Sequence, residues 1–597
     1  MSHAPRHRTF GAAMTALLLA LVTVLPASAQ PANPRAVVNH TAELSILSTT
    51  DLHARLLNWD YLQDRPYGTG RGLARVSTMV EQVRAERTPG STLLLDVGDT
   101  IQGTTLGRYY ATIDSVADGT PHPIATAMNA IGYDTMTVGN HEFNFGLPVL
   151  SAFAEQLDAE LLGANVLRAG TDEPAFTPYV IETVNLPGHK PIRVGILGLT
   201  TPGSALWDRT HVDGRLDFVG GLETAHRYVP EMRAKGADLV IAAVHAGLGN
   251  NSSYGDQLPY PENFGTAVAE QVPGIDLLLA GHTHSNVPQR LVTNQVTGEQ
   301  VVVSQAGSHG QRLGVTDLVL RKERGQWRIA EAAASHLNAN DFADDPAIVE
   351  LVTDQHQAVV DYVNAPVATS LQELTLRNSM TEDVAAIDMM ALVQAEATRE
   401  GLVGTAYEGL PILSARSPLT TSPVTVPAGE VNVRQLASLY LYDNNVLVAL
   451  QVNGGEVVEF LEWVASFYTG VEDAGPHTRA SLVRSGTNAQ WFLQHVYGLS
   501  YDIDLTRPVG QRLVDVRFEG EPLDPTQEFI LATDNYVAGG GGNPPVLPTA
   551  EVAYDPLESI QELITVWAAE QGVLDADAFH AVDWRLVAGD TPIVFAD

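Results

Sequence analysis

The chain has 597 residues, of which 45% are hydrophobic and 17% charged, and this composition excludes a disordered protein. Its 34 lysines and arginines are outnumbered by 70 aspartates and glutamates, which gives a formal net charge of -36. A surface of that sign repels nucleic-acid backbones, so polymeric DNA or RNA is excluded as a partner. A small anionic substrate stays compatible with it if metal ions or local arginines reverse the field inside the site. At this length we expect two large domains.

The N-terminal residues have the pattern of an export signal. Arg6 and Arg8 precede the short apolar run GAAMTALLLALVTVL, and PASAQ offers a cleavage pattern that ends at Ala29. The run is shorter than the about 20 residues that a membrane-spanning helix needs. We therefore predict a signal peptide over 1–29, no membrane anchor, and a periplasmic or secreted protein. Because the chain has no cysteine, disulfides are excluded and metal binding must rely on His, Asp and Asn.

In chain order, five short apolar runs each end in a polar motif. ELSILSTT meets DLH, STLLLD meets VGD, YDTMTV meets GNHE, ADLVIAAV meets HAG, and IDLLLA meets GHTH. Runs of this length, rich in Leu, Val and Ile, are typical of buried strands. The amphipathic stretches GLARVSTMVEQVRAE and ETAHRYVPEMRAKG lie between them and favour helices. We predict an α/β domain over 40–342, with ligands gathered at the carboxyl ends of its strands.

The pattern changes after this domain. Residues 343–366 predict a single linking helix. Residues 367–597 predict a second α/β domain, which contains the stretches LASLYLYDNNVLVALQV and TDNYVAGGGGN. The sequence has no internal repeat and no low-complexity tract, and we expect a monomer.

The polar motifs at the strand ends carry side chains that suit metal binding: Asp51, His53, Asp99, Asn140, His141, His245, His282 and His284. The D-x-H and H-x-H spacings let two side chains point the same way, because side chains alternate along a strand. Each motif by itself is more often structural, but their joint occurrence predicts a site for two divalent ions with Asp99 as a suitable bridge. Two such ions activate water and clamp the attacking and leaving oxygens of a phosphoryl transfer.

TTDLH, VGDTIQG, VGNHEFNFG, VHAG and AGHTH resemble the signature of the calcineurin-like metallophosphoesterases. Within them they look like the 5′-nucleotidase branch, which implies a four-layer α/β/β/α sandwich followed by an α/β nucleotide-binding domain. The ligands that the resemblance implies are, for one ion, Asp51, His53, Asp99 and His284, and for the other Asp99, Asn140, His245 and His282. His141 would contact the phosphoryl group, and metal-activated water would be the nucleophile. This ligand set accepts Zn, Mn, Co or Fe.

Asn144 separates two exported kinds of enzyme in this branch. The 5′-nucleotidases have an aspartate three residues after the catalytic histidine, where this chain has Asn144. GNHEFNFGLPVL, RYVPEMRAKGADLVI, VRQLASLYLYDN and ATDNYVAGGGG instead resemble the bacterial 2′,3′-cyclic-nucleotide 2′-phosphodiesterase/3′-nucleotidases over nearly the whole mature chain. Such enzymes open a 2′,3′-cyclic phosphate to the 3′-nucleotide and hydrolyse that to nucleoside and phosphate. An asparagine orients His141 without compensating an imidazolium, so we expect less reliance on a protonated His141.

Aromatic rings are the expected base-holding groups, because every base offers a face for stacking. The resemblance implies that Tyr442 and Tyr536 sandwich the base, with Asn444 and the glycines of 539–542 close by. Tyr440 competes with Tyr442, since the two rings stand two residues apart. The candidates for ribose or phosphate contacts are Arg416 and Arg434.

Three alternatives stay open. A 5′-nucleotidase or UDP-sugar hydrolase would use the same fold, and Asn144 argues against it. A nucleotide-binding receptor without turnover would have a degenerate metal site, whereas every expected ligand position is filled. A polypeptide-binding or structural surface protein would show repeats or anchoring signals, which the sequence lacks.

Overall fold

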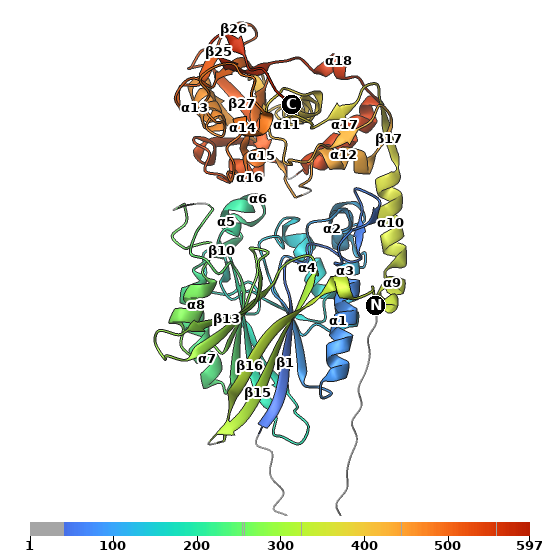
Figure 1. The fold of residues 1–597 in the computed structure, drawn as a ribbon, viewed down its shortest axis with the longest axis vertical. Helices are drawn as coiled ribbons and strands as arrows, with labels where there is room; N and C mark the ends of the chain where they lie inside the picture. Colours follow the sequence, from blue (N-terminus) through green and yellow to red (C-terminus); the bar gives the residue numbers. More distant parts are fainter. Residues whose placement is uncertain (1–40, 254, 256, 324, 443, 557) are drawn as a thin grey trace, which may run out of the picture. The chain divides into compact units, whose positions relative to one another are not determined.

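A computed structural model describes residues 41–597 except 254, 256, 324, 443 and 557 (Figure 1). The predicted signal peptide, 1–29, lies outside the described residues. Within the described part of the chain, none of the helices combines the length and the apolar character needed to cross a membrane.

The first six-stranded sheet of the N-terminal half has the order β16-β15-β1-β4-β5-β6. Its strands are β1 (Thr41–Thr49), β4 (Thr92–Asp96), β5 (Thr135–Thr137), β6 (Glu160–Leu162), β15 (Arg312–Glu323) and β16 (Gln326–Asn338). β1, β4, β5 and β6 run parallel, while β15 is antiparallel to β1 and to β16. The polar motifs that follow β1, β4 and β5 therefore meet at one edge of this sheet.

The second six-stranded sheet has the order β13-β14-β12-β11-β9-β8. Its strands are β8 (Tyr179–Val184), β9 (Ile192–Thr200), β11 (Leu239–His245), β12 (Leu277–Ala280), β13 (Asn286–Thr293) and β14 (Gln300–Ala306). β9, β11, β12 and β14 are parallel. His245 is the last residue of β11, and the GHTH motif follows β12. All five motifs thus stand at the carboxyl ends of strands, as predicted.

The two sheets pack against each other because their strands are apolar on both faces. In β1, Ile46 packs into the apolar cluster between the sheets, and its neighbour Leu47 packs against the helices. In β4, Leu95 packs between the sheets and Leu94 against the helices. Figure 1 shows α1 (Leu73–Glu86) and α3 (Pro123–Ile131) on one side of the sheets, and α7 (Gly221–Ala234) and α8 (Gly265–Gln271) on the other. The predicted four-layer α/β/β/α sandwich is confirmed.

The N-terminal half contains further helices and strands outside the two sheets. They are α2 (Thr105–Arg108), α4 (Gly146–Gln156), α5 (Ser204–Trp207), α6 (Arg209–Val212), β2 (Trp59–Asp60), β3 (Arg65–Pro66), β7 (Val166–Arg168) and β10 (Leu216–Phe218). Of these, α5 and α6 matter most, because Asp208 between them accepts a hydrogen bond from Asn144, two residues after the GNHE motif.

Two helices, rather than one, follow the sandwich: α9 (Pro346–Leu351) and α10 (Thr353–Asn364). The prediction of a single linking helix over 343–366 is wrong in this respect. Val352 leaves the helical conformation, with φ of -115° and ψ of 12°, and its side chain is buried in the apolar cluster under α1 and α3. The chain therefore bends where Val352 turns into the core.

The C-terminal half is a second α/β unit around a five-stranded mixed sheet of order β23-β19-β27-β22-β28. Its strands are β19 (Ile412–Arg416), β22 (Leu447–Asn453), β23 (His495–Tyr497), β27 (Glu528–Asp534) and β28 (Glu551–Tyr554). Phe529 and Leu531 of β27 pack with α13 (Gly454–Ala465), whereas Ala532 packs with α11 (Ala385–Gly401), α12 (Val433–Leu439) and α17 (Ile560–Gln571). A further five-stranded sheet has the order β26-β25-β24-β30-β31. The predicted α/β character of this half is confirmed.

The buried ring of His122 makes the stability of the N-terminal half depend on pH. Its Nδ1 accepts the Ile124 N–H at 3.2 Å as the cap of α3, and Tyr110 and Phe153 surround the ring. Burial lowers the pKa of His122 from 6.5 to about 3. The histidine is therefore neutral when folded but takes up a proton on unfolding, so it stabilises the fold above pH 6.5, and this stability is lost as the pH falls toward 3.

Replacing His122 by asparagine, which keeps a capping oxygen, is expected to make this loss shallower. As the pH is lowered from 6 to 4, the free energy of unfolding decreases in both proteins. The decrease per pH unit should be smaller in the variant than in the wild type by up to about 1.4 kcal/mol. Denaturant unfolding at several pH values measures it, with His226→Asn on the exposed surface of α7 as the control. An unchanged pH dependence in His122→Asn would contradict the assignment.

Candidate metal centre

The structure brings all seven predicted metal ligands to one place. Ligand atoms of His53, Asp99 and His141 lie within 4.8 Å of one another, and so do those of Asp99, His245 and His282. Asp99 belongs to both groups, which is the position predicted for a bridge. The remaining ligands join through close contacts: His284 Nε2 lies 2.9 Å from His53 Nε2 and 3.3 Å from Asp51 Oδ1, and Asn140 Oδ1 lies 2.9 Å from His282 Nδ1.

The backbone at these positions is unusual. Five of the predicted ligands have a positive φ: Asp51 (53°), His53 (49°), Asp99 (58°), His282 (71°) and His284 (54°). Residues other than glycine rarely adopt this left-handed conformation, which costs on the order of 1 kcal/mol or more each. Strain concentrated in five converging residues indicates that the loops are shaped for a ligand rather than for stability.

His245 lies against the carboxylate of Asp99. Its Nδ1 lies 2.6 Å from the carbonyl oxygen of Val97, which can only accept, so Nδ1 carries a proton. The buried Nε2 faces Asp99 Oδ2 at 2.9 Å. Burial by itself lowers the pKa of His245, but the Asp99 carboxylate outweighs it and raises the pKa to about 10. The two groups therefore favour a positive charge between them, and a bound ion would take the place of the proton on Nε2.

His53 and His282 each have one ring nitrogen fixed by a partner and the other turned toward the cluster. His53 Nδ1 donates to the carbonyl oxygen of Gln102 at 3.1 Å, and its Nε2 lies 2.9 Å from His284 Nε2. His282 Nε2 donates to the Glu262 carboxylate at 2.9 Å, and its Nδ1 lies 2.9 Å from Asn140 Oδ1. Converging imidazole nitrogens and carboxylate and amide oxygens fit divalent ions, whose bonds to nitrogen and oxygen are about 2.0–2.2 Å long.

Glu142, the last residue of GNHE, ties two of the motif loops together. Its fully buried carboxylate accepts the N–H of Gly139 and of Asp99 on Oε2, and the N–H of Thr100 on Oε1 at 2.6 Å. This one side chain thus connects the loops after β4 and β5 by hydrogen bonds. It fixes the candidate ligands Asp99 and Asn140 relative to each other.

Glu262, which precedes α8, orients His282. Its carboxylate is buried and accepts from His282 Nε2. Burial by itself raises the pKa of Glu262, but His282 outweighs it and lowers the pKa below the ordinary value, so the carboxylate is ionised. A carboxylate that fixes the tautomer of a metal-binding histidine also raises its basicity.

Glu262→Ala is expected to lower the affinity of the ion held by His282 about 10–100-fold, whereas Glu262→Gln, which keeps an acceptor, should lose less. Calorimetric titration of the metal-free protein with Mn²⁺ measures both variants. The exposed Glu299→Ala serves as the control. Wild-type affinity in Glu262→Ala would show that His282 is oriented without this carboxylate.

His141 heads a short chain of hydrogen bonds. Its Nδ1 lies 2.6 Å from Asn144 Oδ1, and Asn144 Nδ2 donates to Asp208 Oδ1 at 2.6 Å. Asp208 stands between α5 and α6 and is buried. Burial, only partly opposed by the hydrogen bond from Asn144, raises the pKa of Asp208 well above its ordinary value. The predicted orientation of His141 by Asn144 is compatible with this geometry.

The predicted base-stacking residues stay half-exposed. Tyr442 and Tyr536 each keep part of their surface open. Burial, with the nearby Glu262 and Asp534 carboxylates, raises the pKa of Tyr536 to about 12. Asn444 Oδ1 accepts from Gln102 Nε2 at 3.0 Å, next to the carbonyl that orients His53. These residues are available to a ligand near the metal-binding loops.

Two of the other predicted contacts are corrected by burial. Tyr440 and Arg416 are both 0% exposed, and the guanidinium pairs with Asp534 at 2.6 Å and lies over the Tyr440 ring. Both belong to the core of the C-terminal half, so the prediction that they contact substrate is wrong for this structure. Arg434 points elsewhere: it donates to Asn364 at the end of α10 and to the carbonyl of Leu62.

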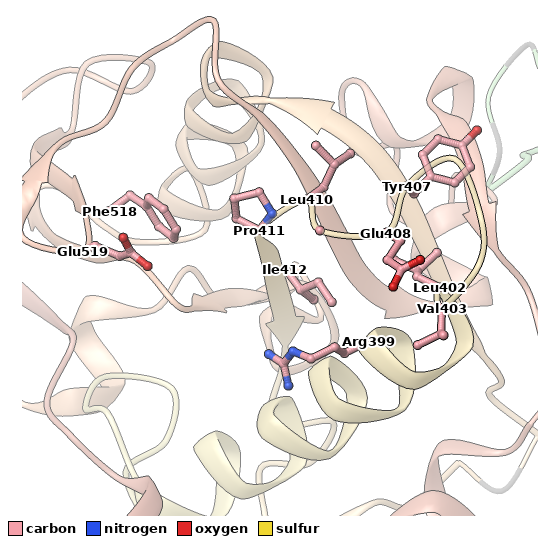
Figure 2. A pocket seen from close by; sticks show the side chains of 11 residues that line it. Arg399, Leu402, Val403, Tyr407, Glu408, Leu410, Pro411, Ile412, Phe518 and Glu519 are labelled. Atoms are coloured by element: carbon pink, nitrogen blue, oxygen red, sulfur yellow. The ribbon is translucent and has the colours of Figure 1, made fainter.

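A separate hollow of about 500 Å³ opens beside the end of α11 (Figure 2). Arg399, Tyr407, Pro411 and Phe518 are among its lining residues. None of the predicted site residues lines it, so it is no part of the candidate centre.

Sequence reasoning missed Glu142, Glu262 and Asp208. Glu142 had a signal, since it directly follows two predicted site residues in GNHE. Glu262 and Asp208 lie outside the five motifs, in the loops that follow β11 and β9, and both stand several residues beyond the strand end. Only the fold brings these carboxyl groups to the site.

Two family profiles match the chain: "Calcineurin-like phosphoesterase" over residues 44–286 and "5′-nucleotidase, C-terminal domain" over residues 363–549. Together with the sandwich and the converging His and Asp side chains, they define a metallophosphoesterase, a hydrolase of phosphoric esters that uses divalent metal ions.

The 2′,3′-cyclic-nucleotide 2′-phosphodiesterase/3′-nucleotidase of Yersinia enterocolitica is 30% identical over 569 residues, which cover 88% of this chain and 84% of that protein. The trifunctional nucleotide phosphoesterase protein YfkN of Bacillus subtilis is 30% identical over 570 residues, 90% of this chain but 38% of that longer protein. The solved 5′-nucleotidase precursor of Thermus thermophilus shares the fold, with a TM-score of 0.57 and 23% identity over 91% of this chain and 99% of that one. The chain belongs to the family of bacterial 2′,3′-cyclic-nucleotide 2′-phosphodiesterase/3′-nucleotidases, as the motifs predicted.

Proposed function

We propose that the chain is an exported enzyme that opens 2′,3′-cyclic nucleotides to 3′-nucleotides and then hydrolyses these to nucleoside and phosphate. The observation that carries the proposal is the convergence of two groups of ligand atoms that share Asp99, those of His53, Asp99 and His141 and those of Asp99, His245 and His282, each within 4.8 Å of one another. The choice of substrate is supported by the name of the Yersinia relative, which matches along most of its length.

The seven converging residues would hold two divalent ions, with Asp51, His53 and His284 on one side of Asp99, and Asn140, His245 and His282 on the other. When bound, the ions would supply Lewis acidity, lowering the pKa of water and neutralising charge on the phosphoryl oxygens. Zn, Mn, Co and Fe all suit this mixture of imidazole, amide and carboxylate.

The chain's own residues complete the site. The His141 backbone N–H donates to Asp99 Oδ1 at 2.8 Å, which fixes the loop that carries the His141 ring. That ring lies edge-on to His53, with 5.1 Å between the centroids, so it stands at the rim of the ligand cluster. From there it would contact the phosphoryl group and stabilise the charge that develops on it.

Tyr442 and Tyr536 would stack on the base, and Asn444 would lie beside it. Hydrogen bonds connect this region to the metal-binding loops: Gln102 to Asn444, and Asn535 Nδ2 to the carbonyl of Trp207 at 3.2 Å. The proposal includes the domain division at 40–342, 343–366 and 367–597, a cleaved leader over 1–29, and a monomer that acts on free nucleotides. The first family profile, 44–286, lies within the first domain, and the second begins at 363, four residues before the second domain.

The test is a side-by-side assay of 2′,3′-cAMP, 3′-AMP and 5′-AMP after removal of metal by a chelator and after addition of Mn²⁺ or Zn²⁺. We expect turnover of 2′,3′-cAMP through 3′-AMP to adenosine, and no turnover by the chelated protein. Strong hydrolysis of 5′-AMP without attack on the cyclic substrate would favour the 5′-nucleotidase alternative. Binding of all three nucleotides without turnover would favour a receptor.

A further inference from the structure

Asp208 is a buried carboxyl group that the metal centre does not use. It is 1% exposed, its Oδ1 accepts from Asn144 Nδ2 at 2.6 Å, and its Oδ2, also buried, has no hydrogen-bond partner among the described residues. A carboxyl group held away from water with an unpartnered oxygen costs free energy. A residue that is unfavourable for stability is commonly kept for what it does.

The amide of Asn144 passes the effect of Asp208 to His141. Because Nδ2 donates to Asp208, the amide oxygen must point to His141, and an amide oxygen only accepts. His141 Nδ1 therefore carries the proton, and Nε2 is left free on the other side of the ring. A rotated amide would instead offer its NH₂ group to His141, and the ring proton would then stand on Nε2 in place of Nδ1.

The surroundings of Asp208 hold it in place. It lies between α5 and α6, and its carbonyl accepts the N–H of His211 at 2.8 Å and that of Val212 at 3.0 Å. The preceding residue, Trp207, stacks on the ring of His282, with 5.7 Å between the centroids and 21° between the planes. The segment that carries Asp208 thus contacts the site at two places: Trp207 packs on His282, and Asp208 bonds to Asn144.

We infer that Asp208 is a positioning residue that fixes the tautomer and the orientation of His141 through the amide of Asn144. This inference rests on the proposed function, in that His141 acts on the phosphoryl group. It assigns to Asp208 no contact with substrate or metal, and it requires only that Oδ1 accept a hydrogen bond.

A double-mutant cycle of Asp208→Ala and Asn144→Ala tests the inference. Each single variant is expected to lower kcat about 10–100-fold with little change in KM. The double variant should be no slower than Asn144→Ala, because the second change then removes nothing that still acts. Asp208→Asn, which keeps an oxygen at the Oδ1 position, should recover most of the kcat lost in Asp208→Ala. Asp213→Ala removes an exposed acid a few residues further on and serves as the matched control.

Two results would overturn the inference. One is a double variant whose loss is the product of the two single losses, which would mean independent roles. The other is a loss of bound Mn²⁺ in Asp208→Ala, measured by elemental analysis, which would place its effect on the metal centre.

The cycle uses whichever of 2′,3′-cAMP, 3′-AMP and 5′-AMP the wild-type protein hydrolyses. Failure of the substrate assignment therefore leaves the cycle measurable, and failure of the cycle leaves the substrate assignment standing.

Discussion

Asp99→Asn is expected to lower the rate of phosphoester hydrolysis by more than about 100-fold. This loss exceeds the about 10–100-fold that is typical when a residue that only orients a metal ligand is replaced. Asp99 is shared by both ligand groups, and it also accepts the backbone N–H of His141. An amide at this position removes a negative charge that faces His245 at 2.9 Å. Activity with saturating Mn²⁺ and the number of ions bound per chain, from elemental analysis, are the measurements.

The exposed Asp172→Asn makes the same chemical change far from the ligands and is expected to leave both values unchanged. If Asp99→Asn retained two ions and wild-type activity, Asp99 would not bridge the two groups. Loss of one ion with part of the activity retained would instead mean that Asp99 serves only one of them.

Glu142→Gln has the second largest expected effect, and it acts on the assembly of the site. The glutamine NH₂ group would face backbone N–H groups that now donate to the carboxylate, so at least one buried N–H is left unsatisfied. The cost is about 3 kcal/mol, because hydrogen bonds to charged groups contribute about 1.5–3 kcal/mol each. For a unit of about 300 residues or more, the melting temperature should fall by roughly 3–5 °C.

Thermal unfolding of the metal-free protein measures this effect without a contribution from bound ions. Glu155→Gln on the exposed side of α4 is the matched control and should melt with the wild type. The metal affinity of Glu142→Gln should fall as well, since the loops of Asp99 and Asn140 lose their common anchor. A variant that melts normally and binds two ions would show that other contacts hold these loops.

The correspondence between sequence and structure is closest where a pattern is local. The five apolar runs form β1, β4, β5, β11 and β12, and the amphipathic stretches form α1 and α7. Each of these follows from the spacing of side chains within one element, which the sequence displays directly. The break at Val352 was not predictable in this way, because it depends on a core built from distant strands and helices.

Within the candidate site, the residue types at the strand ends were enough to predict which side chains meet there. Parallel strands bring their carboxyl ends to one edge of a sheet, and the packing of the two sheets brings the motifs after β1, β4 and β5 together with those after β11 and β12. Tyr440 and Arg416 show the limit of this reasoning. Two tyrosines spaced two residues apart look equivalent in the sequence, and only the burial of Tyr440 under the Arg416 guanidinium distinguishes it as part of the core.

The sequence by itself thus determined the class of protein, the two-domain plan and the side chains that meet at the candidate metal centre. The tertiary structure alone decided which carboxyl groups orient them. Glu262 reaches His282 across 20 positions of the chain, and Asp208 reaches Asn144 across 64. Such contacts depend on how loops from different layers are packed, and no periodicity within a single segment encodes them.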